Sequence, residues 1–171
     1  SAMKPRILSF GEIIFDLIEG RSFLGGAPLN FAWFVNQLGG EATLISSVGD
    51  DDLGSEAIST IEGYGINRHI NFASQPTGTA IVNPHGKFDL TYPAAWNDIE
   101  IPVVEDEFYD LIYLGTLAQT SVFNSRRLGN LVKSASANVF LDLNLRQPLY
   151  SEEIILDSLN MANLVKVNVE E

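Results

Sequence analysis

The sequence predicts an α/β protein with a doubly wound, mostly parallel sheet and a small β-hairpin lid. Short runs of β-branched and aromatic residues alternate with segments of helical periodicity, which is typical of strands joined by helical crossovers. Glycines mark many of the junctions, beginning with Gly25-Gly26. The stretch from 77 to 100 departs from this rhythm and has the turn residues of a hairpin.

The first strand-like runs lie at 7–10 and 13–15, and we interpret them as one buried strand that bends at Gly11, with Asp16 just past the bend. A helix begins at Pro28, which is favourable at a first helical position, and ends at Gly39-Gly40. Its apolar residues cover more than one side, so we expect it to be buried. The later predicted elements are strands at 42–45, 110–114, 139–143 and 164–167 and helices near 57–63, 128–135 and 151–159.

Three adjacent aspartates, 50–52, follow the strand at 42–45. A metal site and a helix N-terminus both use carboxylates in this pattern. We favour the helix N-terminus, because acidic side chains there accept free N–H groups and face a partial positive charge.

The predicted hairpin joins 79–82 to 87–92 through Asn83-Pro84-His85-Gly86. Apolar residues alternate along its second arm, so that one face is apolar. A hairpin outside the main sheet must cover that face with a ligand or with another subunit. We therefore expect a lid that also favours a homodimer, and we interpret His85 as a loop residue.

Composition narrows the function classes. The chain has 171 residues, 22 acidic against 10 basic, and a formal charge of -12. Such a surface repels phosphate backbones and anionic lipid heads, so we expect neither nucleic-acid nor membrane binding. The absence of cysteine excludes a thiol nucleophile and fits a reducing compartment, and the expected localisation is cytoplasmic.

The turn from Gly25 to Asn30 is the first candidate site. Glycine allows close approach of the backbone to a ligand, and the helix start behind it offers free N–H groups to an oxygen-rich ligand. The alternative is that Gly25 and Gly26 serve only the packing of strand against helix.

A second candidate lies at the ends of the last two predicted strands. Extended backbone places Asp142, Asn144 and Arg146 on one side, which suits a polyol, a phosphate or both. The alternative is an exposed polar strand face. Lys166, which alternates with valines, is interpreted on its own as such an exposed position.

With these residues the chain resembles the ribokinase-like (PfkB-type) carbohydrate kinases, most specifically a fructokinase-like member. The family signature is matched by Gly25-Gly26, Pro28, Asn30, Ala32, Gly39 and Gly49. Further matches lie at 11–16, 48–54, 77–80, 142–146 and in Asn168-Val169-Glu170-Glu171, which is similar to the family's asparagine-x-x-glutamate element. Ala94-Ala95-Trp96 with Asp98 resembles members that act on fructose-type sugars.

The resemblance implies roles for individual residues. Sugar hydroxyls would be held by Asp16, Gly25, Gly26 and Asn30, and the substrate-binding set also takes in Tyr92, Asn144 and Arg146. Arg146 would support catalysis near the transferred phosphate. Asn168 and Glu171 would position ATP phosphates and Mg²⁺, with Glu171 acting through water. Lid elements are expected around 12–25 and 77–100, and lids of this family often pair two subunits.

Residues 4–171 are expected to be the N-terminal part of one such domain, with an incomplete sheet and without the ATP-binding half. The family's Gly-Ala-Gly-Asp turn, which carries the catalytic base, is absent. We therefore expect a sugar-binding half that is inactive alone. The alternative is a sugar-binding or regulatory protein that has lost catalysis. A nicotinamide-dependent oxidoreductase ranks lower, because no G-x-G-x-x-G turn follows the first strand.

Overall fold

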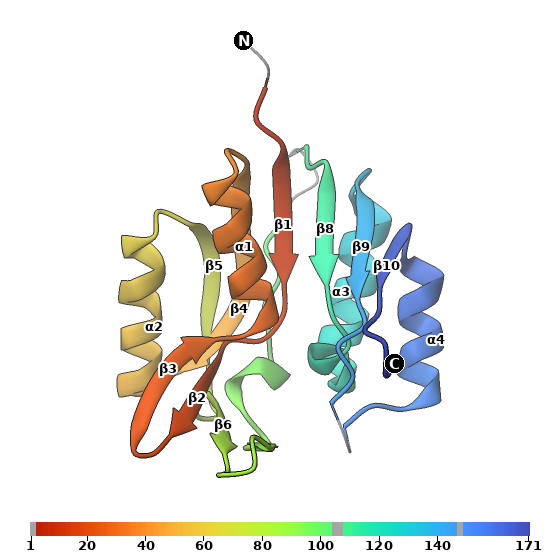
Figure 1. Cartoon of the computed structure of the whole chain (residues 1–171). Helices are drawn as coiled ribbons and strands as arrows, with labels where there is room; N and C mark the ends of the chain where they lie inside the picture. Colours follow the sequence, from red (N-terminus) through yellow and green to blue (C-terminus); the bar gives the residue numbers. More distant parts are fainter. Residues whose placement is uncertain (1–2, 104–107, 147–148) are drawn as a thin grey trace.

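Two β-sheets form the framework of the protein. In the computed structural model, which describes residues 3–103, 108–146 and 149–171, a parallel sheet has the order β10-β9-β8-β1-β4-β5 and a smaller one the order β3-β2-β6-β7 (Figure 1). The strands are β1 (Arg6–Phe10), β2 (Ile14–Ile18), β3 (Arg21–Gly25), β4 (Glu41–Gly49), β5 (Asn67–Ala73), β6 (Gly78–Val82), β7 (Phe88–Leu90), β8 (Leu111–Leu114), β9 (Asn138–Asp142) and β10 (Leu164–Lys166). The helices are α1 (Ala27–Gln37), α2 (Asp52–Gly63), α3 (Val122–Ser134) and α4 (Glu152–Met161), with short 3-10 helices η1 (Ala95–Asn97) and η2 (Leu117–Thr120).

The main sheet is wound in two directions from its centre. From β1 the chain passes through α1 to β4 and through α2 to β5, whereas from β8 it passes through α3 and α4 to β9 and β10 on the other side. Right-handed crossovers in opposite directions put the two helix pairs on opposite faces. Two apolar clusters agree with this: Leu44 packs with residues of α1 and α2, and its neighbour Ile45 with residues of α3. The predicted doubly wound α/β fold is confirmed.

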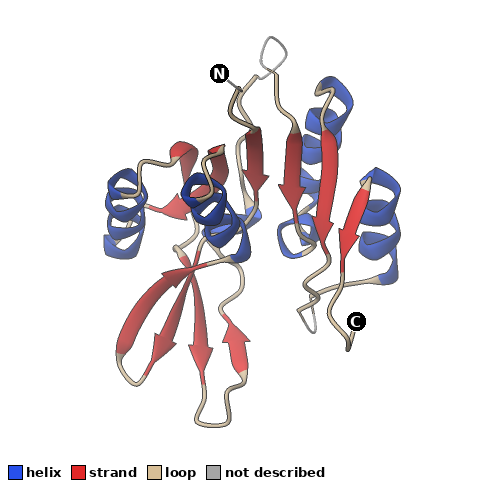
Figure 2. Cartoon of the chain, turned by 45° about the horizontal axis from the view of Figure 1, so that its top comes forward, coloured by secondary structure: helices blue, strands red, loops and turns tan. Residues whose placement is uncertain are grey.

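The small sheet, which we call the lid for short, consists of β2, β3, β6 and β7 and lies across the carboxyl ends of the main strands (Figure 2). Strands β2 and β3 are antiparallel, β6 runs parallel to β2, and β7 completes the predicted hairpin antiparallel to β6. The prediction of one bent strand over 7–15 was wrong, since β1 and β2 belong to different sheets. Gly11, with φ +147°, makes the turn between them, and its N–H donates to Ile45 O at 3.1 Å.

Strand β5 had no counterpart in the sequence prediction. It is an edge strand whose first three residues, Asn67 to His69, are exposed and polar. An edge strand buries little of its surface, so its sequence lacks the apolar alternation that identifies inner strands.

The aspartate run caps a helix, as expected. Asp51 is the N-cap of α2 and accepts hydrogen bonds from Gly54 N, Thr77 N and Thr77 Oγ1 at 2.6 to 2.9 Å. Burial raises the pKa of Asp51, but the hydrogen bonds from Thr77 and Gly54 outweigh it and lower the pKa below its ordinary value. The carboxylate thus ties α2 to the start of the lid strand β6.

A second buried polar group fixes the loops behind the lid. The side chain of Asn124, fully buried in α3, accepts from Ile99 N and donates to Trp96 O and Ala118 O. One amide therefore joins α3 to η1 and η2.

Among the described residues, no helix combines the length and apolar character that a membrane span requires.

Candidate functional site

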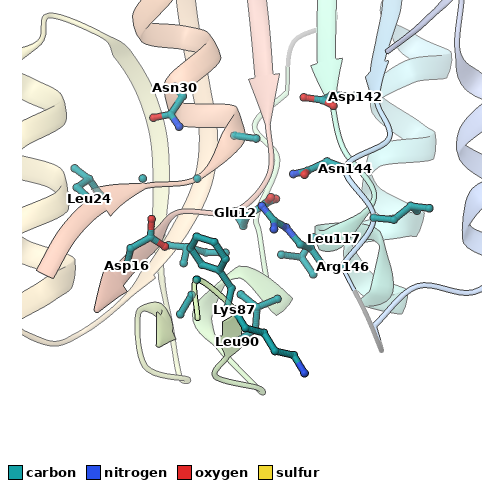
Figure 3. Close-up of a pocket in the computed structure, with 18 of the residues that line it drawn as sticks. Glu12, Asp16, Leu24, Asn30, Lys87, Leu90, Leu117, Asp142, Asn144 and Arg146 are labelled. Atoms are coloured by element: carbon teal, nitrogen blue, oxygen red, sulfur yellow. The ribbon is translucent and has the colours of Figure 1, made fainter. Parts of the chain in front are cut away.

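A cleft of about 680 Å³ lies between the small sheet and the carboxyl ends of the main strands (Figure 3). It opens where the winding of the sheet reverses, between β1 and β8, which is the usual ligand position in open α/β sheets. Its lining comes from the lid, from α1 and from the ends of β9 and β10: Glu12, Ile14, Asp16, Leu24, Gly25, Gly26, Ala27, Asn30, Ala80, Gly86, Lys87, Phe88, Leu90, Leu117, Asp142, Asn144, Leu145, Arg146 and Lys166.

Asp16 forms the lid side of the cleft. It lies on β2 with its carboxylate beside Gly25, where an added Cβ would come within 3.9 Å of Asp16 Oδ2. Burial raises the pKa of Asp16, and the nearby positive charge of Arg146 partly opposes this rise. The carboxylate is thus a partly desolvated acceptor, suited to hydroxyl donors.

Gly26 and Asn30 bring the start of α1 to the cleft. Gly26 is the N-cap of the helix, has φ +108° and makes no side-chain cap, while Asn30 directs its amide to the cleft (Figure 3). A Cβ at Gly26 would lie 2.4 Å from the carbonyl oxygen of Glu12. The packing interpretation of this glycine is therefore confirmed, and the same tight packing places the helix start on the cleft. Ligand binding by Gly26 stays a prediction.

Asp142, Asn144 and Arg146 form the opposite wall. The expected extended alternation was wrong: β9 ends at Asp142, Asn144 has φ +43°, and Leu145 lines the cleft as well. Asp142 accepts from Tyr113 Oη at 2.7 Å and lies 3.6 Å from Lys166 Nζ. Lys166 is exposed, as interpreted, but it also belongs to the lining of the cleft, which that interpretation left out. The sequence could not show this, because the pairing of Lys166 with Asp142 comes from the register of β10 against β9.

Glu12 is a lining residue whose role sequence reasoning missed. It lies in the link between β1 and β2 and is 4% exposed. Burial, opposed by its own backbone N–H and by Arg146, raises the pKa of Glu12 to about 7. The available signal was a single acid, next to Gly11, inside the apolar stretch 7–15. Buried carboxyls with shifted pKa values are frequent in functional sites.

Replacing Glu12 with glutamine is expected to stabilise the protein above pH 7. The native pKa of about 7 exceeds the ordinary 4.5, so the native state binds the Glu12 proton more tightly than the unfolded state does. This preference stabilises the native state at low pH, and the stabilisation is lost as pH rises from 4.5 to 7. At about 1.4 kcal/mol per pKa unit, the loss amounts to about 3 kcal/mol. Urea unfolding at pH 5 and pH 8 measures it: the difference between the two pH values should shrink in Glu12→Gln, and an unchanged difference would contradict the assignment.

Three residues of the predicted site lie outside the lining. Tyr92 is half-exposed with its ring 5.9 Å from that of Trp96. Glu171 accepts from Asn168 N at 2.9 Å and from Leu145 N at 2.6 Å, so its carboxylate joins the turn after β10 to the loop that carries Arg146. The proposed contacts of Tyr92, Asn168 and Glu171 with ligands stay predictions.

The fold and the cleft define an α/β protein in which a small sheet faces a cleft lined by carboxylate, amide, ammonium and guanidinium groups. Residues 3–171 match the pfkB family carbohydrate kinase profile. The chain belongs to this family, as the sequence motifs indicated.

Individual relatives agree with the assignment. The chain is 27% identical to a fructokinase of Escherichia coli over 194 aligned positions, covering 99% of this chain and 62% of the relative. It is similar to a sugar kinase from Pyrococcus horikoshii solved in complex with ATP (TM-score 0.80, 26% identity, 93% of this chain and 62% of that one). The fold also matches a Vibrio cholerae fructokinase bound to fructose, ADP and calcium (TM-score 0.81, 21% identity, 94% and 59%). The chain thus spans about three fifths of the length of these relatives.

Proposed function

We propose that this chain is the acceptor-binding part of an ATP-dependent kinase that phosphorylates a hydroxyl of a fructose-like sugar. The observation that carries the proposal is the convergence of Asp16, the Gly25-Gly26 backbone, Asn30 and Arg146 on one cleft. Fructokinases among the relatives favour fructose as the first candidate.

Each of these groups has a distinct part in the proposed chemistry. The Asp16 carboxylate accepts hydrogen bonds from sugar hydroxyls, Asn30 both donates and accepts, and free N–H groups at the start of α1 donate. Arg146 lies across the cleft and supplies positive charge near the transferred phosphoryl group. Phosphoryl transfer depends mainly on such positioning and charge stabilisation.

The phosphate end of the site is proposed on the other edge of the cleft. Asn168 and Glu171 would hold the magnesium and nucleotide phosphates, partly through water. When bound, Mg²⁺ would neutralise charge on the phosphates of ATP. The hydrogen bond from Leu145 N to Glu171 means that any such contact also fixes the loop of Arg146.

The lid is proposed to exclude water and to pair two copies of the chain. The register puts Ile18, Phe23 and Phe88 on the same face of the small sheet as Asp16, where they are 37%, 45% and 46% exposed. Apolar side chains of this size next to a cleft favour coverage by a second subunit. Exclusion of water would limit wasteful hydrolysis of ATP.

A thermal-shift panel with fructose, ribose, ketodeoxygluconate and adenosine tests the acceptor. We expect fructose to raise the melting temperature most, because binding to the native state alone stabilises it. We also expect no sugar-dependent release of ADP from ATP, since the Gly-Ala-Gly-Asp turn is not in this chain. A shift with another sugar only would refute fructose, and turnover by the 171-residue chain would refute the acceptor-half proposal.

A further inference from the structure

Glu12 is a buried carboxyl group to which the proposed function assigns no role. It occupies the short link between the main sheet and the lid, and its position there is tightly determined. Ser46 Oγ donates to Gly11 O at 2.6 Å, and Gly26 packs against the Glu12 carbonyl so closely that no Cβ fits. The backbone therefore fixes where the Glu12 side chain enters the cleft.

The groups that face Glu12 come from the opposite wall, from strand ends and from the loop after β9. Figure 3 shows its carboxylate and the Arg146 guanidinium directed toward one another. Arg146 acts on Glu12 as the opposite charge, and Asp142 as a like charge. Asp142 is in turn held by Lys166 and by Tyr113, so its negative charge is already partly compensated. Arg146 is thus the cation best placed to meet Glu12.

Arg146 also reaches the lid. Its guanidinium carbon lies 5.7 Å from the centre of the Phe88 ring on β7. An exposed arginine on a loop has many rotamers of similar energy, and a contact to a ring alone fixes it weakly. The fixed carboxylate of Glu12 adds an attraction between opposite charges, which favours the rotamers of Arg146 that point into the cleft.

We propose that Glu12 is a positioning residue that holds the guanidinium of Arg146 toward the acceptor cleft beneath Phe88. The inference rests on the proposed function, in which Arg146 supports phosphoryl transfer to a sugar. It assigns a role in the site to the link between β1 and β2: Glu12, which lies in this link, orients Arg146 on the opposite wall of the cleft.

The protonation of Glu12 then controls the orientation of Arg146. An ionised Glu12 attracts the guanidinium of Arg146. A neutral Glu12 carries no charge to attract it, so water solvates the guanidinium instead. Asp142, Lys166 and Tyr113 face the same region, so the test must separate the effect of the Arg146 charge from the effects of these groups. Removing the arginine alone should raise the pKa of Glu12, because it removes the charge that lowers this pKa.

Carboxyl ¹³C NMR with labelled glutamate measures this pairing without any sugar. The Glu12 signal, identified by its loss in Glu12→Gln, should titrate near neutral pH and move to higher pH in Arg146→Ala. Arg126→Ala removes the same charge from an exposed position on α3 and is the matched control. An unchanged Glu12 titration in Arg146→Ala, or the same shift in both variants, overturns the proposal.

Calorimetric titration of fructose into the chain between pH 5.5 and 8.5 measures the consequence. We expect Glu12→Gln to lower the affinity at pH 8 by about tenfold and to flatten its rise with pH, and Glu12→Asp to recover part of both. The same Glu12→Gln variant should be more stable than wild type at pH 8, which a loss of fold would not produce.

The outcomes separate the two proposals. Fructose affinity that is unchanged in Glu12→Gln, with normal binding by wild type, overturns the positioning role and leaves the sugar site standing. Absence of binding in wild type with every sugar of the panel refutes the proposed function, and with it the role of Glu12 in a sugar kinase.

Discussion

Replacement of Gly26 with alanine is expected to destabilise the protein by about 2 to 5 kcal/mol and to abolish sugar binding. A positive φ costs an L-residue about 1 to 2 kcal/mol, and crowding of a packed site typically costs a further 1 to 3 kcal/mol. Here the added Cβ would lie 2.4 Å from a backbone oxygen, that of Glu12, so a main-chain segment must move. That segment is the link between β1 and β2. Because Gly26 is also the N-cap of α1, whose start lines the cleft, a shift there should disrupt sugar binding.

Gly39→Ala is the matched control for this prediction. Gly39 also has a positive φ, +91°, but no atom lies within 4 Å of a Cβ added there. Its substitution should therefore show only the conformational cost of about 1 to 2 kcal/mol and leave binding intact. Urea unfolding and fructose calorimetry on both variants measure the difference. Equal losses in the two would mean that the close approach of Gly26 to Glu12 does not matter.

The parts of the fold that the sequence predicted best are those buried by the main sheet. The strands near 110–114 and 139–143 and the helix that begins near Pro28 agree with β8, β9 and α1, because residues enclosed by neighbours carry a strong apolar pattern. The link around Gly11 was misread for the converse reason. Apolar residues continue on both sides of it, while a three-residue link, 11–13, in which Gly11 has a positive φ, separates two strands of different sheets.

The candidate site was predictable where its residues are close in sequence. Asp142, Asn144 and Arg146 follow a buried strand within five residues, so the sequence predicted them at one edge of the sheet; the expected extended geometry was wrong, because β9 ends at Asp142 and Asn144 has φ +43°. Glu12 and Lys166 reach the cleft from opposite ends of the chain, and only the strand order and register bring them to Arg146 and Asp142. The raised pKa of Glu12 could not be predicted either, because it results from burial, and burial of a residue in a link follows from tertiary packing alone.

Asp16→Ala is expected to weaken fructose binding about 100-fold, a factor that corresponds to about 3 kcal/mol. A carboxylate that accepts from two hydroxyls contributes about 1.5 to 3 kcal/mol per charge-assisted bond. Asp16→Asn keeps one acceptor and should lose less, about tenfold. Burial raises the pKa of Asp16, so wild-type affinity should fall at acid pH through the protonation of this carboxyl, and the Asp16→Asn variant should not show that fall.

Asp89→Asn separates this effect from a general change of lid charge. Asp89 lies on β7, is exposed and is not part of the cleft lining, so its substitution removes one negative charge from the same sheet and should leave the affinity unchanged. The fold should also survive at Asp16: its raised pKa means that the native state disfavours the ionised carboxylate, and an uncharged isostere relieves that cost. Weak binding in a variant with an undiminished melting temperature would therefore assign Asp16 to the acceptor. Equal affinity in Asp16→Ala and wild type would remove it from the site.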